Sequence, residues 1–133
     1  MKKNENLLFV SKKWLDFAIE DYQAVEILWN GENKLYRTLC FHAQQYVEKI
    51  LKGILENEGK SPPRTHDVNA LTIRCEGLGC RIPLSETEIL FLSSVYIDAR
   101  YPPDVGLLPK GEPTEGDAAL AVKAVRKLKN VLH

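Results

Sequence analysis

The chain of 133 residues has the size of one domain and is long enough to bury a single hydrophobic core without disulfides or metals. Its hydrophobic fraction of 44% is that of an ordinary globular protein, and no apolar run approaches the roughly 18 residues of a membrane span. Lys plus Arg equals Asp plus Glu at 18 each, which argues against a protein that coats nucleic acid through bulk charge. Lys12 and Lys13 interrupt the apolar patch near the start, so we expect no signal peptide and a cytoplasmic location.

The first predicted element is an amphipathic helix at about residues 11–29. Its apolar residues recur at helical intervals: Trp14, Phe17, Ala18, Val25 and Leu28. Asp16, Glu20, Asp21 and Gln23 occupy much of the remaining surface. Asn30-Gly31 follows, and because both residues tolerate a left-handed conformation we expect them to end the helix in a left-handed cap.

The second predicted helix, at about residues 34–58, is the one around which we expect the others to pack. Apolar residues at gaps of three and four form one face of it: Leu35, Leu39, Ala43, Val47, Ile50 and Ile54. The opposite side carries a polar stripe: His42, Gln45, Lys49 and Lys52. We expect this helix to be both the spine of the core and the platform for whatever the protein binds.

Two helices are predicted after the proline-containing connection that follows Gly59. Asp67 is a suitable N-cap for a short helix at about 67–78, whose apolar face is narrow. The next apolar stretch could form a buried strand, but Ser85 and Glu88 have the spacing of a capping box. This spacing favours a helix at about 85–100.

Residues 98–113 contain four prolines and two glycines and are predicted to form a long loop. A connection of this length inside a small domain is often a binding loop. Thr114 and Asp117 then have capping-box spacing at the start of a last helix, about 115–131, whose outer side is basic. The predicted fold is therefore all-α, an up-and-down antiparallel bundle of four to five helices that spans residues 1–133 as one domain.

The three cysteines, Cys40, Cys75 and Cys80, do not predict a disulfide framework or a zinc site. Their number is odd, and Cys40 lies in the central helix. Cys75 and Cys80 are too far apart for a CxxC knuckle, and no second ligand pair is present. We therefore expect reduced thiols, no structural metal and no cofactor.

Four short motifs occur in a fixed order along the chain: Ala43, Gln44 and Gln45; Glu48, Lys49 and Lys52; Thr65, His66 and Asp67; Arg100, Tyr101 and Pro102. In this combination the sequence resembles the HEPN family of small prokaryotic proteins. The first helix, with Trp14, Ala18 and Asp21, also looks like the opening of that family. The resemblance covers nearly the whole chain, which makes it more specific than any single motif.

The resemblance implies an up-and-down helical bundle, usually a homodimer, often encoded beside a minimal nucleotidyltransferase as a toxin–antitoxin-like pair. Many relatives are metal-independent ribonucleases that use an arginine followed after four to six residues by a histidine. No histidine follows Arg100 at that spacing, whereas Arg37 and His42 satisfy it within the second helix. That is the wrong context, so we interpret the second match as chance.

Each charged candidate has a functional and a structural interpretation. Lys49 and Lys52 could hold a phosphate as point charges, or Lys52 could pair with Glu48 at the i,i+4 spacing. His42 could act as a general acid or base, or it could be a half-buried histidine capped by a neighbour such as Tyr46. The two interpretations of the lysines are evenly balanced, and for His42 the structural one is favoured.

The third helix and the long loop add further candidates. Arg64 and His66 lie at the start of that helix, where free backbone N–H groups attract anions, although Asp67 already supplies a carboxylate there. His66 could instead donate a hydrogen bond that fixes the loop. Arg100 could present its guanidinium to a phosphate with Tyr101 beside it for a base, or the two could pack over the end of the bundle.

Three functional hypotheses follow. The first is a dimeric HEPN protein that binds a nucleotide, an RNA end or a nucleotidyltransferase, with these contacts: Arg100, Tyr101, Lys49, Lys52, His66 and Arg64. Asp67, Gln45 and Glu48 are assigned structural roles. The second is a metal-independent ribonuclease that uses His42 with Arg37 or Arg100, and the third is a subunit with a purely structural task.

Overall fold

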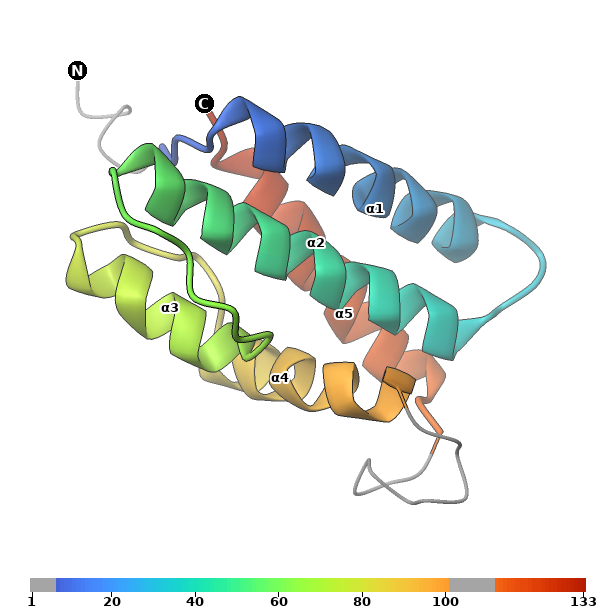
Figure 1. The fold of residues 1–133 in the computed structure, drawn as a ribbon. Coiled ribbons are helices and arrows are strands. Elements are labelled where there is room, and N and C mark those ends of the chain that lie inside the picture. Colours follow the sequence, from blue (N-terminus) through green and yellow to red (C-terminus); the bar gives the residue numbers. More distant parts are fainter. Residues whose placement is uncertain (1–6, 101–111) are drawn as a thin grey trace.

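The computed structural model describes residues 7–100 and 112–133, with only the backbone described at 96–100. Five helices follow one another in this part of the chain: α1 Lys12–Asn30, α2 Tyr36–Asn57, α3 Val68–Gly77, α4 Glu86–Arg100 and α5 Glu115–Asn130 (Figure 1). The all-α prediction is confirmed, and the observed helices start and end within two residues of the predicted positions. No helix among these residues is long and apolar enough to cross a membrane.

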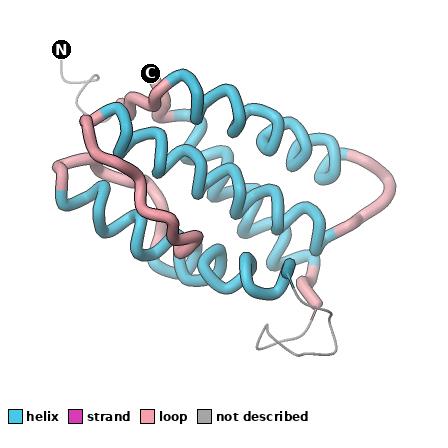
Figure 2. The backbone as a smooth tube through the Cα atoms, in the orientation of Figure 1, coloured by secondary structure: helices cyan, strands magenta, loops and turns pink. Residues whose placement is uncertain are grey.

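Helix α2 lies at the centre of the bundle and contacts every other helix (Figures 1 and 2). Helix α1 runs antiparallel beside it, α5 lies behind the two, and α3 and α4 cover the remaining side. Five residues of the predicted apolar face are at most 1% exposed: Leu39, Ala43, Val47, Ile50 and Ile54. Leu35 was wrongly placed on this face, because it precedes the helix and is 53% exposed. The prediction that this helix forms the spine of the core is thus confirmed.

Helix α2 approaches the start of α1 closely at Gly53. A β-carbon at this position would lie 2.8 Å from Cβ of Trp14 and would overlap a methyl group of Val10. The Gly53 carbonyl also accepts a hydrogen bond from the Ser11 amide at 3.1 Å, just before α1 begins. A glycine is therefore required here by the packing of the two helices.

The helix starts use the caps that the sequence predicts. The Asp67 carboxylate accepts hydrogen bonds from the amides of Asn69 and Ala70, at the start of α3. Ser85 and Glu88 exchange hydrogen bonds before α4, and Thr114 and Asp117 form a capping box before α5. These contacts satisfy backbone N–H groups that lack partners within the helices.

The predicted left-handed cap at the end of α1 is wrong, because Gly31 has an extended conformation with φ −86°. The Asn30 side chain donates to the carbonyl of Glu26 at 2.9 Å, so this end is partly satisfied without a chain reversal. Left-handed glycines occur instead after α2 and α3, at Gly59 with φ 81° and Gly79 with φ 87°.

Two further features differ from the sequence-based expectations. Helix α4 continues through Arg100, so residues 98–100 belong to the helix and not to the predicted loop, of which 101–111 lie outside the described residues. In addition, Leu8 and Leu132 form an isolated parallel β-bridge that joins the segments before α1 and after α5. This pairing has no local signal in the sequence, because neither segment is long enough to show an alternating pattern.

Candidate functional site

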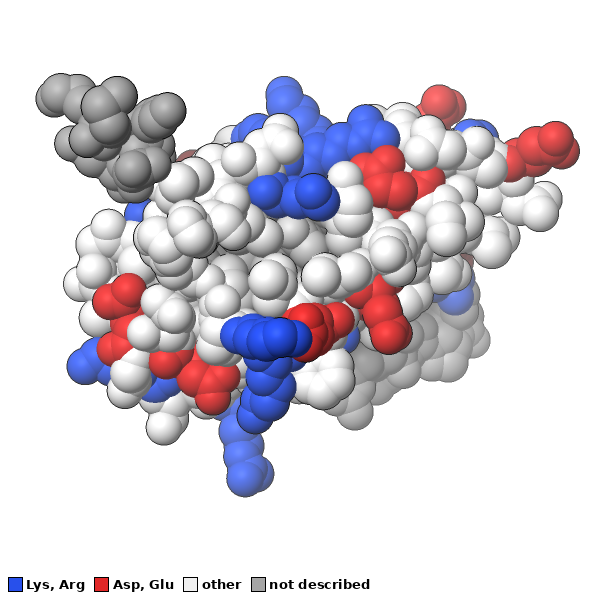
Figure 3. All heavy atoms as spheres, turned by 90° about the horizontal axis from the view of Figure 1, so that it is seen from above, with Lys and Arg blue, Asp and Glu red and all other residues white. Residues whose placement is uncertain are grey.

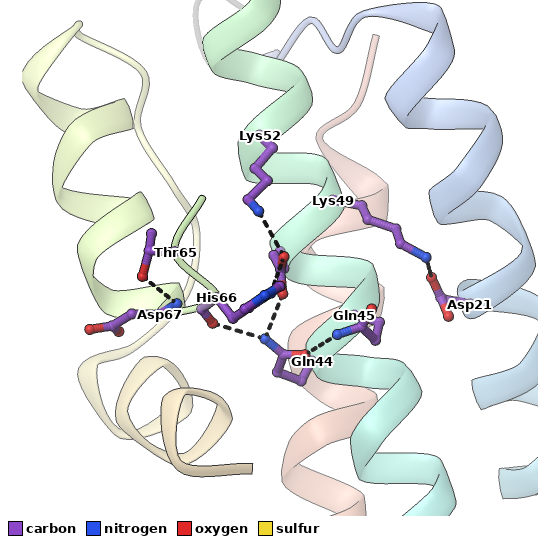
Figure 4. A network of polar contacts seen from close by, with 9 residues as sticks. Asp21, Gln44, Gln45, Lys49, Lys52, Thr65, His66 and Asp67 are labelled. Carbon is purple, nitrogen blue, oxygen red and sulfur yellow. Dashed lines mark hydrogen bonds and ion pairs between the residues drawn. The ribbon is translucent and has the colours of Figure 1, made fainter. Parts of the chain in front are cut away.

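A buried carboxylate on α2, Glu48, organises the polar contacts between α2 and the loop before α3. Figure 4 shows its partners Gln44, Lys52 and His66. The Glu48 carboxylate accepts from Lys52 Nζ at 2.9 Å, from His66 Nδ1 at 2.8 Å and from Gln44 Nε2 at 3.1 Å. The Glu48 side chain is 6% exposed and that of Lys52 is 8% exposed. A carboxylate at this depth is stable as an anion only because several donors surround it.

Both the imidazole and the backbone of His66 are held by α2. The Gln44 side chain donates to the His66 carbonyl at 3.1 Å and accepts from Gln45 Nε2 at 2.7 Å. His66 therefore fixes the loop before α3, and the acceptor for its ring nitrogen is Glu48. Gln45 supports this contact indirectly, because its hydrogen bond orients the side-chain amide of Gln44.

A second buried carboxylate, Asp21 on α1, holds α1 against α2. It contacts Lys49 Nζ at 2.7 Å and His42 Nδ1 at 2.8 Å, and its side chain is 8% exposed. His42 is half-buried as expected, but its partner is Asp21 and not Tyr46. The reason is that Tyr46 is packed into the core, with its ring 5.7 Å from that of Tyr22.

Glu48 and Asp21 each pair with one lysine and one histidine, and Glu48 also accepts from Gln44. As a result the polar stripe of α2 faces neighbouring elements rather than open solvent. The ammonium groups of Lys49 and Lys52 are both in ion pairs with carboxylates that are less than 10% exposed. Lys52 also lies 5.9 Å from the centre of the Trp14 ring. This arrangement favours the structural interpretation of both lysines.

The Asp21–His42 pair has the geometry of an oriented histidine. If the carboxylate accepts from Nδ1–H, the basic nitrogen of the neutral ring is Nε2, which could accept a proton. Arg37, five residues earlier in α2, pairs instead with Glu112 near the start of α5. Five residues correspond to a rotation of about 140° around a helix. Arg37 therefore contacts Glu112 and His42 contacts Asp21, so within one chain the two side chains do not point to a common site.

The remaining candidates lie at the ends of helices. Arg64 is exposed in the connection between α2 and α3. The backbone of Arg100 ends α4, beside the start of α2 that carries Arg37 (Figure 1). The side chain of Arg100 and all of Tyr101 lie outside the described residues. In one chain, therefore, Arg100 is brought toward Arg37 and away from Lys49, which lies in the second half of α2.

Sequence reasoning missed how deeply Asp21 is buried. The signal was available, because Asp21 comes three residues after Ala18 and four before Val25, both of which are fully buried. An acid at that position of an amphipathic helix lies on the apolar face and needs a cationic partner. Lys127, predicted on the outer side of α5, likewise pairs at 2.7 Å with Glu88, which is 2% exposed.

Two candidate chemistries find no support in the described part of the chain. No group of three or more His, Cys, Asp or Glu side chains is placed to hold a metal ion there. On the face of the molecule seen in Figure 3, basic and acidic side chains are interspersed and separated by uncharged surface. This face therefore carries no continuous basic patch of the kind that binds long nucleic acids.

Comparison with known proteins identifies the family. The HEPN domain matches residues 11–133, from the residue before α1 to the last residue of the chain. No curated protein and no solved structure gives a significant match. The matched span includes all five helices and both buried carboxylates. The chain belongs to the HEPN domain family.

Proposed function

We propose that this HEPN protein binds the phosphate of a nucleotide or an RNA end, at the end of the bundle where α4 finishes beside the start of α2. The observation that supports this is that α2 and α4 pack against each other and run in opposite directions, so that the start of α2, with Arg37, and the end of α4, with Arg100, lie toward the same end of the bundle. The Arg37 side chain is 39% exposed. An arginine presents several N–H groups in a plane and suits a phosphate better than a lysine does.

The guanidinium of Arg37 is not saturated by its protein partner. Its terminal nitrogen pairs with Glu112, whereas Nε is buried and has no hydrogen-bond partner among the described residues. A buried donor without an acceptor is costly, so a ligand or a rearranged neighbour that supplies an acceptor would be favoured. Tyr101, next to Arg100 in sequence, is proposed to stack against a base.

The polar network on Glu48 and Asp21 has a supporting role in this proposal. Lys49, Lys52 and His66 are engaged with those carboxylates and fix α1 and the α3 loop to α2. We therefore assign phosphate binding to the arginines rather than to the lysines. Arg64, which is exposed, is retained as an outer contact.

A second candidate function, a subunit that covers a protein partner, is favoured by exposed apolar side chains. Phe17 and Ile27 on α1 are 57% and 71% exposed, and Ile73 on α3 and Leu90 on α4 are 62% and 52% exposed. Such side chains are suited to contact with another protein, either a second copy of the chain or a minimal nucleotidyltransferase. Light scattering after gel filtration tests the first option, because Ile27→Glu or Ile73→Glu should then shift a dimer to a monomer.

The ribonuclease alternative has one structural feature in its favour, the oriented His42 ring. It requires a phosphate-stabilising arginine, which Arg37 cannot supply within the same chain. Incubation of the protein with labelled RNA in chelator decides the question. Cleavage that His42→Ala abolishes would establish the ribonuclease and displace the binding function proposed above.

The binding proposal is tested by fluorescence anisotropy with a short RNA that carries a 5′-phosphate. Arg37→Met and Arg100→Met should each weaken binding about tenfold or more, because a hydrogen bond to a charged group contributes about 1.5–3 kcal/mol. Lys123→Met is the matched control, since this exposed lysine of α5 carries the same charge. Equal affinity of the arginine variants and the control, or of phosphorylated and unphosphorylated RNA, would contradict the proposal.

A further inference from the structure

A cavity of about 420 Å³ lies between α1 and α5, on a different part of the molecule from the proposed phosphate site. Leu15 and Ile19 of α1 and Leu132 after α5 provide apolar walls, and Tyr22, Tyr46 and Lys129 also line it. Its volume falls within the roughly 300–1,000 Å³ that is usual for small-molecule sites.

Tyr46 of α2 is the one buried residue among the described residues that line the cavity. Tyr46 is 2% exposed, and its hydroxyl makes no hydrogen bond with any other residue that the structure describes. The neighbouring Tyr22 differs, because its hydroxyl is hydrogen-bonded to Glu26. Burial raises the pKa of Tyr46, so the phenol is a neutral donor across the physiological range. Arg37 Nε is the fully buried side-chain donor without a partner among the described residues, so the Tyr46 hydroxyl keeps some access to open space, where an acceptor in the cavity can reach it.

Lys129 gives the cavity a positive charge. Its ammonium lies 5.1 Å from the centre of the Tyr22 ring and makes no ion pair with a described residue. Among the described residues that line the cavity there is no Asp or Glu. The site therefore combines apolar walls, a hydroxyl donor and one lysine cation, with Gln23 and His133 also in its lining, and this combination is complementary to an anion with an apolar body.

We propose that the cavity between α1 and α5 binds a small amphipathic monoanion, an aliphatic or aromatic carboxylate or sulfonate. The apolar body lies between Leu15, Ile19 and Leu132. The anionic group accepts the hydrogen bond of the Tyr46 hydroxyl and faces the Lys129 ammonium. This site is separate from the arginine-bearing end of the bundle, so the two proposals are tested independently, with different ligands.

The test uses anilinonaphthalene sulfonate as the probe, followed by its fluorescence, with decanoate as competitor. Tyr46→Phe removes only the hydroxyl and should weaken probe binding about tenfold, the effect of losing a hydrogen bond to a charged acceptor. Lys129→Gln should weaken it to a similar extent. Ile19→Trp, which fills the mouth of the cavity, should abolish it. Lys123→Gln on the same helix is the matched control and should bind as the unchanged protein does.

Each possible result decides the proposal. Displacement of the probe by decanoate, together with the loss in all three cavity variants, supports it. Absence of probe binding, binding that Tyr46→Phe and Lys129→Gln leave unchanged, or displacement by AMP and not by decanoate would overturn it. The melting temperature of each variant, followed by circular dichroism, separates loss of the site from loss of the fold.

Discussion

The change Glu48→Gln tests whether the polar network holds the helices together. The substitution keeps the size of the side chain but removes the negative charge from a position where three donors converge. Lys52 is 8% exposed and pairs with Glu48 at 2.9 Å, so the variant leaves a buried ammonium without its counter-ion. Removal of one partner of a buried ion pair costs about 3–5 kcal/mol.

The chain contains a matched control for this change. Asp16→Asn makes the same carboxylate-to-amide substitution in the pair with Lys12, which has the same i,i+4 spacing and a distance of 2.8 Å. Those two side chains are 55% and 86% exposed, and an exposed pair contributes at most about 1 kcal/mol. The two carboxylates therefore differ in burial and in the number of donors, which is three at Glu48 and one at Asp16.

Urea denaturation at neutral pH, followed by circular dichroism, measures the free energy of unfolding of both variants. We expect Glu48→Gln to lose several times more stability than Asp16→Asn. The double variant Glu48→Leu, Lys52→Met should recover much of the loss, because it removes both charges together and can be near neutral. Similar small losses for the two single variants would refute the argument that the buried network stabilises the bundle.

Four other predictions follow from individual residues. Gly53→Ala should lower the free energy of unfolding by about 1–3 kcal/mol, because its new methyl group overlaps α1. A β-carbon at Gly77 would meet open space, so Gly77→Ala should raise the free energy of unfolding by up to about 1 kcal/mol. Thermal melts of both glycine variants, followed by circular dichroism, measure the two changes. Burial raises the pKa of the Cys75 thiol to about 12. Ellman's reagent should therefore modify the less buried Cys80 before Cys75, and equal rates of modification of the two thiols would contradict this. The hydrogen bonds from Arg126 on α5 lower the pKa of the Glu26 carboxyl. The stabilisation that this pair gives the folded protein is therefore fully present above the ordinary carboxyl pKa, and it is lost as the pH falls through the lowered pKa of Glu26. The stability difference between the protein and Glu26→Gln, about 1 kcal/mol or less at neutral pH, should vanish in acid, and a difference that persists there would exclude this cause.

The helices could be predicted closely because their signals are local. Capping residues such as Asp67, Ser85 and Thr114 mark helix starts within a few residues of sequence, and apolar periodicity shows which face is buried. The end of α1 was less predictable. Gly31 permits a left-handed conformation but does not impose it, and the observed extended geometry depends on the path of the following loop.

The polar network could be predicted only in part, because it depends on distances between helices. The i,i+4 pair of Glu48 and Lys52 was visible in the sequence, since both lie on one helix. The contacts of Asp21 were not, because α1 and α2 must first be packed before Lys49 can reach across. The same limit applies to the approach of Arg100 to Arg37, which follows from the antiparallel arrangement of α2 and α4.

The most direct test of the proposed function is to map the bound phosphate on the protein by NMR. Amide chemical shifts would be recorded while AMP or a short RNA with a 5′-phosphate is added. We expect the largest changes in the first turn of α2 around Arg37 and in the last turn of α4 up to Arg100. Changes centred on Lys49, Lys52 and His66, or no changes at all, would contradict the assignment of the phosphate to the arginine-bearing end.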